Sequence, residues 1–226
     1  MNVVGIDCSS PRGSVALCTS DGIVTEREWS ADSRDDAVMW TLLRELLVDH
    51  AMDWGAVHVW VAGCGPGSYT GLRIAITAAR VLALAGNSVA VGLDSGWATA
   101  QRAMELVPAE QILVAGDARR GQAWYGLFRR NDAGLAVQIV PWSLCPLAKV
   151  AELVPPGGVG CSPDWERLSK APSFRPDVSC WWPHSVPPSA RWLAERAAEL
   201  AQSGEPLNPP SPVYLHPPVE TPTISR

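Results

Sequence analysis

The first residues that could do chemistry end the first apolar segment, where Asp7 is followed by Ser9 and Ser10. A carboxylate with adjoining hydroxyls could contact a phosphate or a phosphate-bound metal ion. The same three residues could instead form a capped turn, because short polar side chains hydrogen-bond to the nearby backbone. We favour the turn, and we keep Asp7, Ser9 and Ser10 as the residues of a degenerate nucleotide site.

A second stretch, Gly-Cys-Gly-Pro-Gly-Ser-Tyr-Thr-Gly-Leu-Arg at residues 63–73, invites a nucleotide interpretation. It lacks the lysine of a P-loop, and Ser68 breaks the Gly-x-Gly-x-x-Gly fingerprint of dinucleotide sites. Backbone amides at the start of the following helix could still hold an anion. The alternative is a tight strand-to-helix turn, since glycine and proline shape the backbone closely. The residues of this structural motif are Gly65, Pro66, Gly67, Ser68, Thr70 and Gly71, of which Ser68 or Thr70 can cap the helix.

The histidines and cysteines do not follow the spacing of a known metal site. The four histidines form neither a His-x-x-x-His nor a His-Glu-x-x-His pair, and the six cysteines contain no Cys-x-x-Cys pair. We therefore expect no metal, no cofactor and no catalytic residue, and we expect free thiols in a reducing compartment. The net charge of −5 argues against a protein that binds nucleic acid alone, because such proteins usually present a basic face.

Apolar periodicity predicts the elements that position these stretches. In the first half we expect strands over 2–7, 14–19, 23–29, 57–62 and 88–93, and helices over 37–50, 71–85 and 95–106. The order strand-strand-strand-helix-strand-helix-strand resembles the ribonuclease-H-like lobe of actin, Hsp70 and sugar kinases. We therefore expect an α/β fold of the actin/Hsp70-like class, with two such lobes whose mixed sheets are flanked by helices.

The second half repeats the three-stranded meander without repeating the sequence. We expect strands over 112–116, 122–130, 135–140 and 157–161, and helices over 143–154 and 188–204. Periodicity is weak between them, where 162–189 is rich in Trp, Pro and Ser. The expected organisation is an N-terminal lobe over 1–106, a shortened C-terminal lobe over 107–215 and an extended or disordered tail over 216–226, with a polar loop at 32–36.

The helix expected over 71–85 has only two charged residues and is apolar nearly all round. Such a helix is buried on more than one face. The chain's own sheet can cover one face, so the opposite face needs another helix or another protein. This pattern predicts a partner interface on the helix and on the amphipathic helix 37–50 beside it, formed by Leu72, Arg73, Ile76, Ala79, Arg80, Ala83, Met39 and Leu43.

Three segments together resemble one family, the bacterial TsaB (YeaZ) proteins. The first is Gly-Ile-Asp at 5–7, and the second and most specific is 65–73, where the family usually has Phe in place of Tyr69. The third is Asp-Ala-Arg-Arg-Gly-Gln at 117–122, followed by Pro-Val-Tyr-Leu at 212–215. These matches keep the family's order across about residues 1–215.

The resemblance implies a role in forming the threonylcarbamoyl group on N6 of adenosine 37 in tRNA. It implies that the chain is not the transferase itself but a cytoplasmic subunit that forms a heterodimer with TsaD, the catalytic paralogue. The ATPase TsaE and ATP then act through the complex, and the chain contacts tRNA only indirectly. The patch that binds TsaD could form a homodimer when the chain is alone.

Two other functions stay open. An ATP-using phosphotransferase of the same fold would need Asp7 and the glycine loops to hold nucleotide and Mg²⁺. A glycoprotease-like peptidase is the weaker alternative, because no Ser/His/Asp set or metalloprotease motif supports it. No apolar run is long enough to span a bilayer and the start lacks a basic signal region, so we expect a cytosolic protein without membrane attachment.

Overall fold

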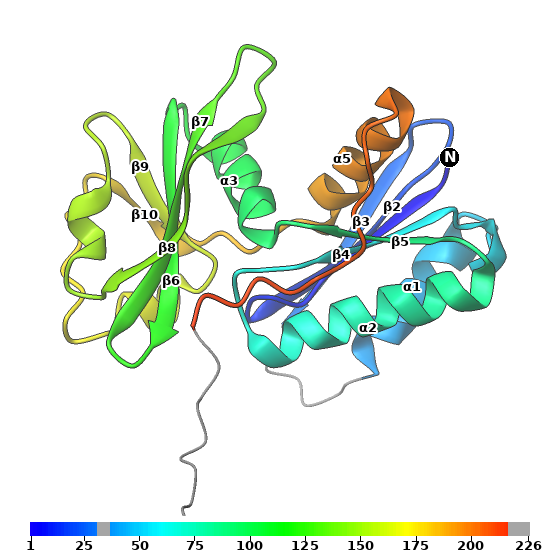
Figure 1. Cartoon of the computed structure of the whole chain (residues 1–226), viewed down its shortest axis with the longest axis horizontal. Helices are drawn as coiled ribbons and strands as arrows, with labels where there is room; N and C mark the ends of the chain where they lie inside the picture. Colours follow the sequence, from blue (N-terminus) through cyan, green and yellow to red (C-terminus); the bar gives the residue numbers. More distant parts are fainter. Residues whose placement is uncertain (31–36, 217–226) are drawn as a thin grey trace, which may run out of the picture.

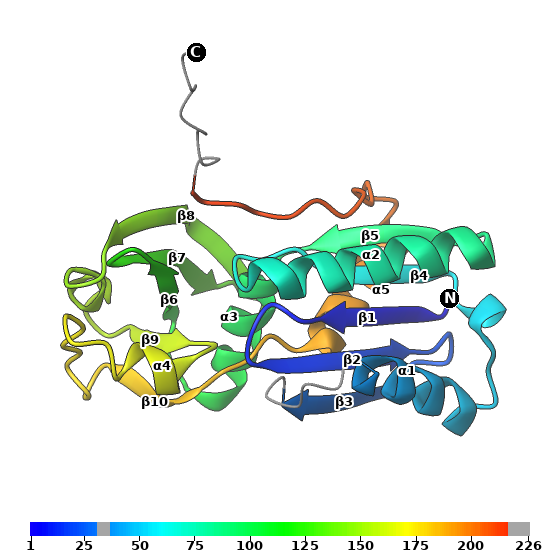
Figure 2. The same cartoon turned by 90° about the horizontal axis from the view of Figure 1, so that it is seen from below.

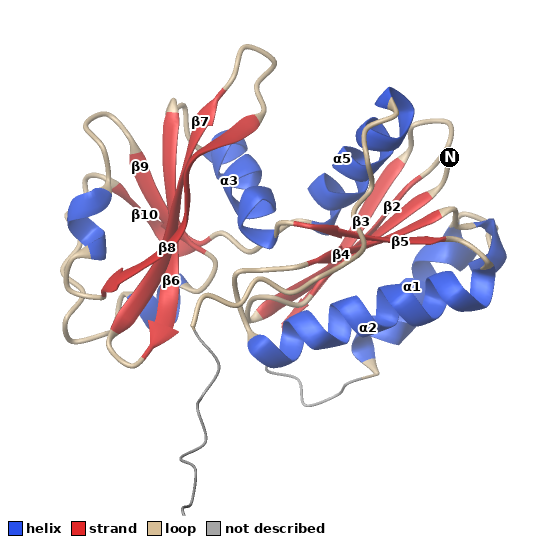
Figure 3. Cartoon of the chain, in the orientation of Figure 1, coloured by secondary structure: helices blue, strands red, loops and turns tan. Residues whose placement is uncertain are grey.

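A computed structural model describes residues 1–30 and 37–216, which form two five-stranded mixed sheets flanked by helices (Figures 1 and 3). This arrangement confirms the expected α/β fold of two ribonuclease-H-like lobes. The loop expected at 32–36 and the tail expected beyond His216 lie outside the described residues.

The first sheet has the order β3-β2-β1-β4-β5. Strand β1 pairs antiparallel with β2 and parallel with β4, which pairs parallel with β5. Helices α1 and α2 cover one face and α5 covers the other (Figure 1). The bounds are β1 Val3–Asp7, β2 Arg12–Cys18, β3 Val24–Ser30, α1 Val38–Asp49, 3₁₀ helix η1 Trp54–Ala56, β4 Val59–Gly63, α2 Tyr69–Gly86, β5 Val89–Leu93 and α5 Ala190–Ser203.

The second sheet has the order β10-β9-β6-β7-β8, which repeats the first sheet strand for strand. Strand β6 pairs antiparallel with β7 and parallel with β9. The helices on this lobe are much shorter, apart from α3. The bounds are α3 Ser95–Leu106, β6 Gln111–Arg119, β7 Gln122–Arg130, β8 Ala136–Pro146, 3₁₀ helix η2 Val150–Leu153, β9 Val159–Ser162, α4 Trp165–Leu168 and β10 Trp181–Ser185.

Two helices pack on the sheet of the other half of the sequence. In α3, Ala103 and Met104 lie in one core cluster with Ile112 of β6. In α5, Leu193 lies in one cluster with Val3 of β1. Packing therefore crosses the expected boundary at residue 106 in both directions, and a separation of the lobes at that residue stays a prediction.

The prediction of a helix over 143–154 is wrong. Strand β8 continues to Pro146, with Leu144 opposite Trp124 of β7, and only η2 follows it. The ring of Trp142 lies 5.6 Å from that of Trp124 and 5.5 Å from that of Phe128. These cross-strand aromatic contacts favour a strand over the local helical spacing.

The long helix α2 begins two residues before the predicted start. The hydroxyl of Ser68 accepts a hydrogen bond from the amide of Gly71 at 3.3 Å, so Ser68 is the cap. The helix ends at Gly86, and Asn87 caps it in the left-handed conformation with φ +50°.

Candidate functional site

The glycine turn between β4 and α2 is hydrogen-bonded to its surroundings. The amide of Ser68 donates to the carbonyl of Ser9 at 2.7 Å, and the amide of Gly65 donates to the hydroxyl of Ser95 at 3.0 Å. A P-loop holds phosphate with free backbone amides. The amides of Gly65 and Ser68 have protein acceptors, so these two are not free to hold a phosphate.

Close approach of the backbone explains the glycines of the turn. A Cβ on Gly71 would lie 1.7 Å from the carbonyl oxygen of Cys8, and a Cβ on Gly67 would lie 2.3 Å from that of Ser9. Gly65 has a φ of +105°, which L side chains rarely adopt. The glycines therefore let the backbone of the turn pack closely against the backbone of Cys8 and Ser9, which follow β1.

Asp7 is fully buried at the end of β1. One carboxylate oxygen accepts from the amide of Ser9 at 2.8 Å and from its hydroxyl at 2.7 Å, while Ser10 donates to the carbonyl of Arg12 at 2.6 Å. A Cβ on Gly63 would lie 1.8 Å from the other oxygen of Asp7, which explains that glycine. Burial raises the pKa of Asp7, and hydrogen bonds from Ser95 and Ser9 oppose this. The arrangement is that of a capped turn in which Ser9 and Ser10 are also buried, at 4% and 6% exposed.

The sequence analysis missed Asp94. One of its oxygens accepts from the amide of Trp97 at 3.0 Å, which caps α3, and the other accepts from the indole of Trp142 on β8. Burial raises the pKa of Asp94 to about 6. An Asp before a helical stretch is a readable cap signal, but the sequence gives no sign of the distant Trp142.

Both lobes line one groove of about 1510 Å³. Three of the stretches singled out in the sequence meet there: the turn after β1, the glycine motif and the turn between β6 and β7. The lining residues include Ser9, Ser10, Gly67, Ser68, Tyr69, Thr70, Asp117, Arg119, Arg120, Trp124, Arg167, Tyr214 and His216.

The segment after α5 passes from the first lobe to the second (Figures 1 and 2). The amide of Gly92 donates to the carbonyl of Asn208 at 2.9 Å, and the amide of Val213 donates to that of Cys64 at 2.8 Å. Further on, the imidazole of His216 lies 2.7 Å from the carbonyl oxygen of Ala118. The segment thus joins the edge of the first sheet to the β6–β7 turn.

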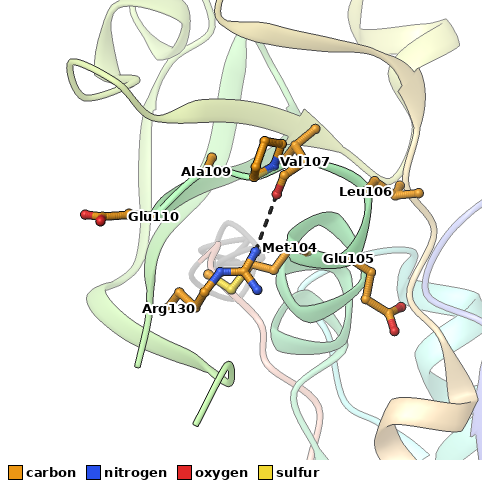
Figure 4. A pocket seen from close by; sticks show the side chains of 8 residues that line it. Met104, Glu105, Leu106, Val107, Ala109, Glu110 and Arg130 are labelled. Carbon is orange, nitrogen blue, oxygen red and sulfur yellow. Dashed lines mark hydrogen bonds between the residues drawn. The ribbon is translucent and has the colours of Figure 1, made fainter. Parts of the chain in front are cut away.

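A smaller pocket of about 540 Å³ lies at the end of α3 (Figure 4). The guanidinium of Arg130 points at the main chain there and donates to the carbonyls of Met104 and Val107. Carbonyls at a helix end have no partner within the helix. Arg130 therefore stabilises the end of α3, and its contacts indicate a structural role.

Six of the predicted interface residues are buried within the chain itself, so their assignment to a partner surface is wrong. On α2 the spacing of three to four residues turns them toward the sheet, and Ile76, for example, is only 5% exposed. Arg73 and Arg80 are exposed but contact Tyr214 and the carbonyl of Pro210. The six buried residues are Leu72, Ile76, Ala79, Ala83, Met39 and Leu43.

The exposed sides of the same two helices also carry large apolar residues. On α2, Ile74, Val81 and Leu84 are 41%, 56% and 85% exposed, and their spacing places them on one stripe. On α1, Trp40 and Val48 are also exposed. Both helices lie on the same face of the first sheet (Figure 1). We call these five residues the outer stripe.

Comparison with known proteins identifies the family. The family model described as "TsaD: tRNA N6-adenosine threonylcarbamoyltransferase" matches residues 33–178. Two solved structures of YeaZ-type proteins from Pseudomonas aeruginosa superpose with a TM-score of 0.79 at 25% and 26% identity, over 95% of this chain and 99% of theirs. The chain belongs to the TsaB family.

Curated relatives of this TsaB-family chain carry the name "tRNA threonylcarbamoyladenosine biosynthesis protein TsaB". The Escherichia coli protein is 28% identical over 60% of this chain, and the Bacillus subtilis protein is 29% identical over 68% of it. The matched part spans 58% of the first relative and 66% of the second.

The described residues of the TsaB-family chain hold neither a metal-binding cluster nor a membrane-spanning helix. Within residues 1–30 and 37–216, no three histidine, cysteine or acidic side chains lie close enough together to hold a metal ion. Among those same residues, no helix combines the length and the hydropathy needed to cross a bilayer.

Proposed function

We propose that the chain is an accessory, non-catalytic subunit in the formation of N6-threonylcarbamoyladenosine in tRNA, and that it acts by pairing with the transferase TsaD. Membership of the TsaB family and the printed name of its relatives support the pathway. The match to the TsaD family model means that the chain resembles the transferase over more than half its length. The ATPase TsaE completes the proposed assembly, and ATP enters through the complex.

The outer stripe is the observation that carries this proposal. Isolated exposed apolar side chains are normal, whereas a contiguous apolar surface marks an interaction site. Exposed apolar residues on two helices that cover the same face of the sheet suit packing against helices of a second protein. Because TsaD resembles this chain, its corresponding helices are the expected partner, and a second copy of the chain could occupy the stripe when TsaD is absent.

The experiment compares charge on the outer stripe with charge elsewhere. We expect Val81→Glu combined with Leu84→Glu to abolish the complex with TsaD of the same organism, because burying two carboxylates in an apolar interface is costly. Size-exclusion chromatography with light scattering measures the complex. Val178→Glu is the matched control, since Val178 is 75% exposed on the second lobe.

Both variants should keep the unfolding transition of the parent protein, because the substituted side chains are exposed. An intact complex in the stripe variant would overturn the assignment of the partner surface. Loss of the complex in the Val178 control as well would show that the effect is not specific to the stripe.

The alternative, an ATP-using phosphotransferase, has weaker support. Such an enzyme needs a carboxylate that can reach Mg²⁺ and amides that can reach phosphate. Asp7 is buried within its own turn, and the amides of Gly65 and Ser68 donate to protein acceptors. Isothermal titration of the isolated chain with ATP and Mg²⁺ separates the two functions, because tight binding that Asp7→Ala abolishes would favour the phosphotransferase.

A further inference from the structure

The turn between β6 and β7 holds two arginines in an unusual backbone conformation. Arg119 and Arg120 have φ angles of +68° and +53°, and Gly121 follows with +71°. Left-handed residues other than glycine are uncommon, and they persist where the surrounding structure fixes them. Here Asp117 fixes the turn by accepting from the amide of Arg119 at 2.6 Å.

These arginines supply charge that the groove does not neutralise. The two carboxylates that line the same groove, Asp117 and Asp164, both pair with Arg167, at 3.1 and 3.3 Å. Among the residues that the structure describes, no carboxylate lies within ion-pair distance of the guanidinium of Arg119 or Arg120. The groove therefore offers two unpaired cations to a ligand, in a chain whose net charge is −5.

Exposed aromatic rings stand beside this charge. The rings of Tyr69 and Tyr214 lie 5.3 Å apart, and they are 54% and 47% exposed. The guanidinium of Arg73 lies 4.1 Å from the centre of the Tyr69 ring and donates to the hydroxyl of Tyr214 at 3.3 Å. Two residues beyond Tyr214, His216 contacts the carbonyl of Ala118, which places the tyrosine pair next to the arginine turn.

We propose that the groove binds an unpaired nucleic-acid strand, with a base stacked on the Tyr69–Tyr214 pair and phosphates held by Arg119 and Arg120. Sites for unpaired strands combine a cationic groove with aromatic side chains on which bases stack. The volume of about 1510 Å³ exceeds the roughly 300–1,000 Å³ of small-molecule sites, which favours a strand over a single nucleotide. An acidic peptide would use the arginines but would leave the flat exposed rings without a role.

This proposal goes beyond the proposed pairing with TsaD. It also departs from the expectation that the chain contacts tRNA only indirectly, through the complex. The groove residues differ from those of the outer stripe. Variants of the groove should therefore keep the complex with TsaD, so failure of either proposal can be told from failure of the other.

The test measures fluorescence anisotropy of a labelled single-stranded RNA of about ten nucleotides, within the range of known site sizes. We expect saturable binding that weakens with salt, with a slope of log K on log[salt] of about −1.4, because each contacted phosphate contributes about −0.7. Arg119→Asn combined with Arg120→Asn should remove most of this slope. Asparagine suits the comparison because it tolerates the left-handed conformation.

Arg129→Asn is the matched control. Arg129 is exposed and pairs with Gln111 at the opposite end of the same β6–β7 hairpin, so its loss should leave binding unchanged. Tyr69→Leu should weaken binding roughly 5- to 150-fold, whereas Tyr69→Phe keeps the ring and should bind as the parent does.

Three results would overturn the proposal. The first is the absence of saturable binding, or binding that the double arginine variant does not change. The second is competition by ATP that equals competition by the strand, which would indicate a mononucleotide pocket. The third is equal competition by polyglutamate, which would indicate an acidic-peptide site.

Discussion

The two lobes share one topology but cover their sheets differently. Each begins with a strand that carries an aspartate at or near its end, Asp7 in β1 and Asp117 in β6, and each aspartate accepts a hydrogen bond from the amide two residues on, at 2.8 and 2.6 Å. On the first lobe, helices of 12 and 18 residues follow in the chain. At the same places in the second lobe stand a four-residue 3₁₀ helix and a four-residue α-helix. Within the described residues, therefore, only the first lobe has two long helices that follow one another in the chain and cover one face of its sheet.

Aromatic side chains replace the missing helices of the second lobe. The ring of Phe174 lies 5.1 Å from that of Trp181, and the ring of Trp165 lies 6.0 Å from both. All three belong to one core cluster on the face of the second sheet. The Trp-rich stretch 162–189 thus supplies core, because large rings bury much apolar area without a long helix.

The largest expected effect distinguishes the side of α2 that packs on the sheet from the side that is exposed. Ile76 is buried and Ile74 is exposed on the same helix. We expect Ile76→Glu to lower the free energy of unfolding by about 5 kcal/mol, since it adds an unpaired buried charge to the loss of apolar contacts. Ile74→Glu should change it by less than about 0.5 kcal/mol. Urea denaturation measures both, and equal effects would show that α2 has no distinct inner side.

A second test concerns the aromatic core of the other lobe. Phe174 is 1% exposed, so Phe174→Ala should lower the free energy of unfolding by about 4 kcal/mol, through lost burial and the cavity that remains. Val178→Ala, four residues on at an exposed position, is the control and should cost less than about 0.5 kcal/mol. A small effect of Phe174→Ala would mean that the short elements hold the second lobe without the aromatic cluster.

Periodicity was enough to predict most strands and the long helices, because each has a clear apolar pattern. It could not tell Ile76 from Ile74, since a helix apolar nearly all round does not show which side meets the sheet. It also missed the extension of β8, where Trp142 depends on contacts with another strand. The groove brings together residues as far apart in the sequence as Ser9 and Tyr214. No local sequence pattern predicts that these residues lie close together.

The smallest expected effect tests Asp94, the carboxylate that joins the two lobes through Trp142. Its pKa is about 6 in the folded chain against an ordinary value of 3.8, so folding favours the protonated form. The stability from Asp94 is therefore full below about pH 4 and is lost as the pH rises through about 6. At about 1.36 kcal/mol per pKa unit, the loss by pH 7 is about 3 kcal/mol.

Asp94→Asn removes this titration. Its single amide oxygen can accept from the amide of Trp97 or from the indole of Trp142 but not from both, which adds a cost that does not change with pH. Urea denaturation of both proteins from pH 4 to pH 7 should show the variant gaining about 3 kcal/mol relative to the parent. A difference that stays constant with pH would mean that Asp94 is charged at no cost in the fold. The contact between the lobes would then be an ordinary solvated cap, and the lobes would differ only in the helices and aromatic rings that cover them.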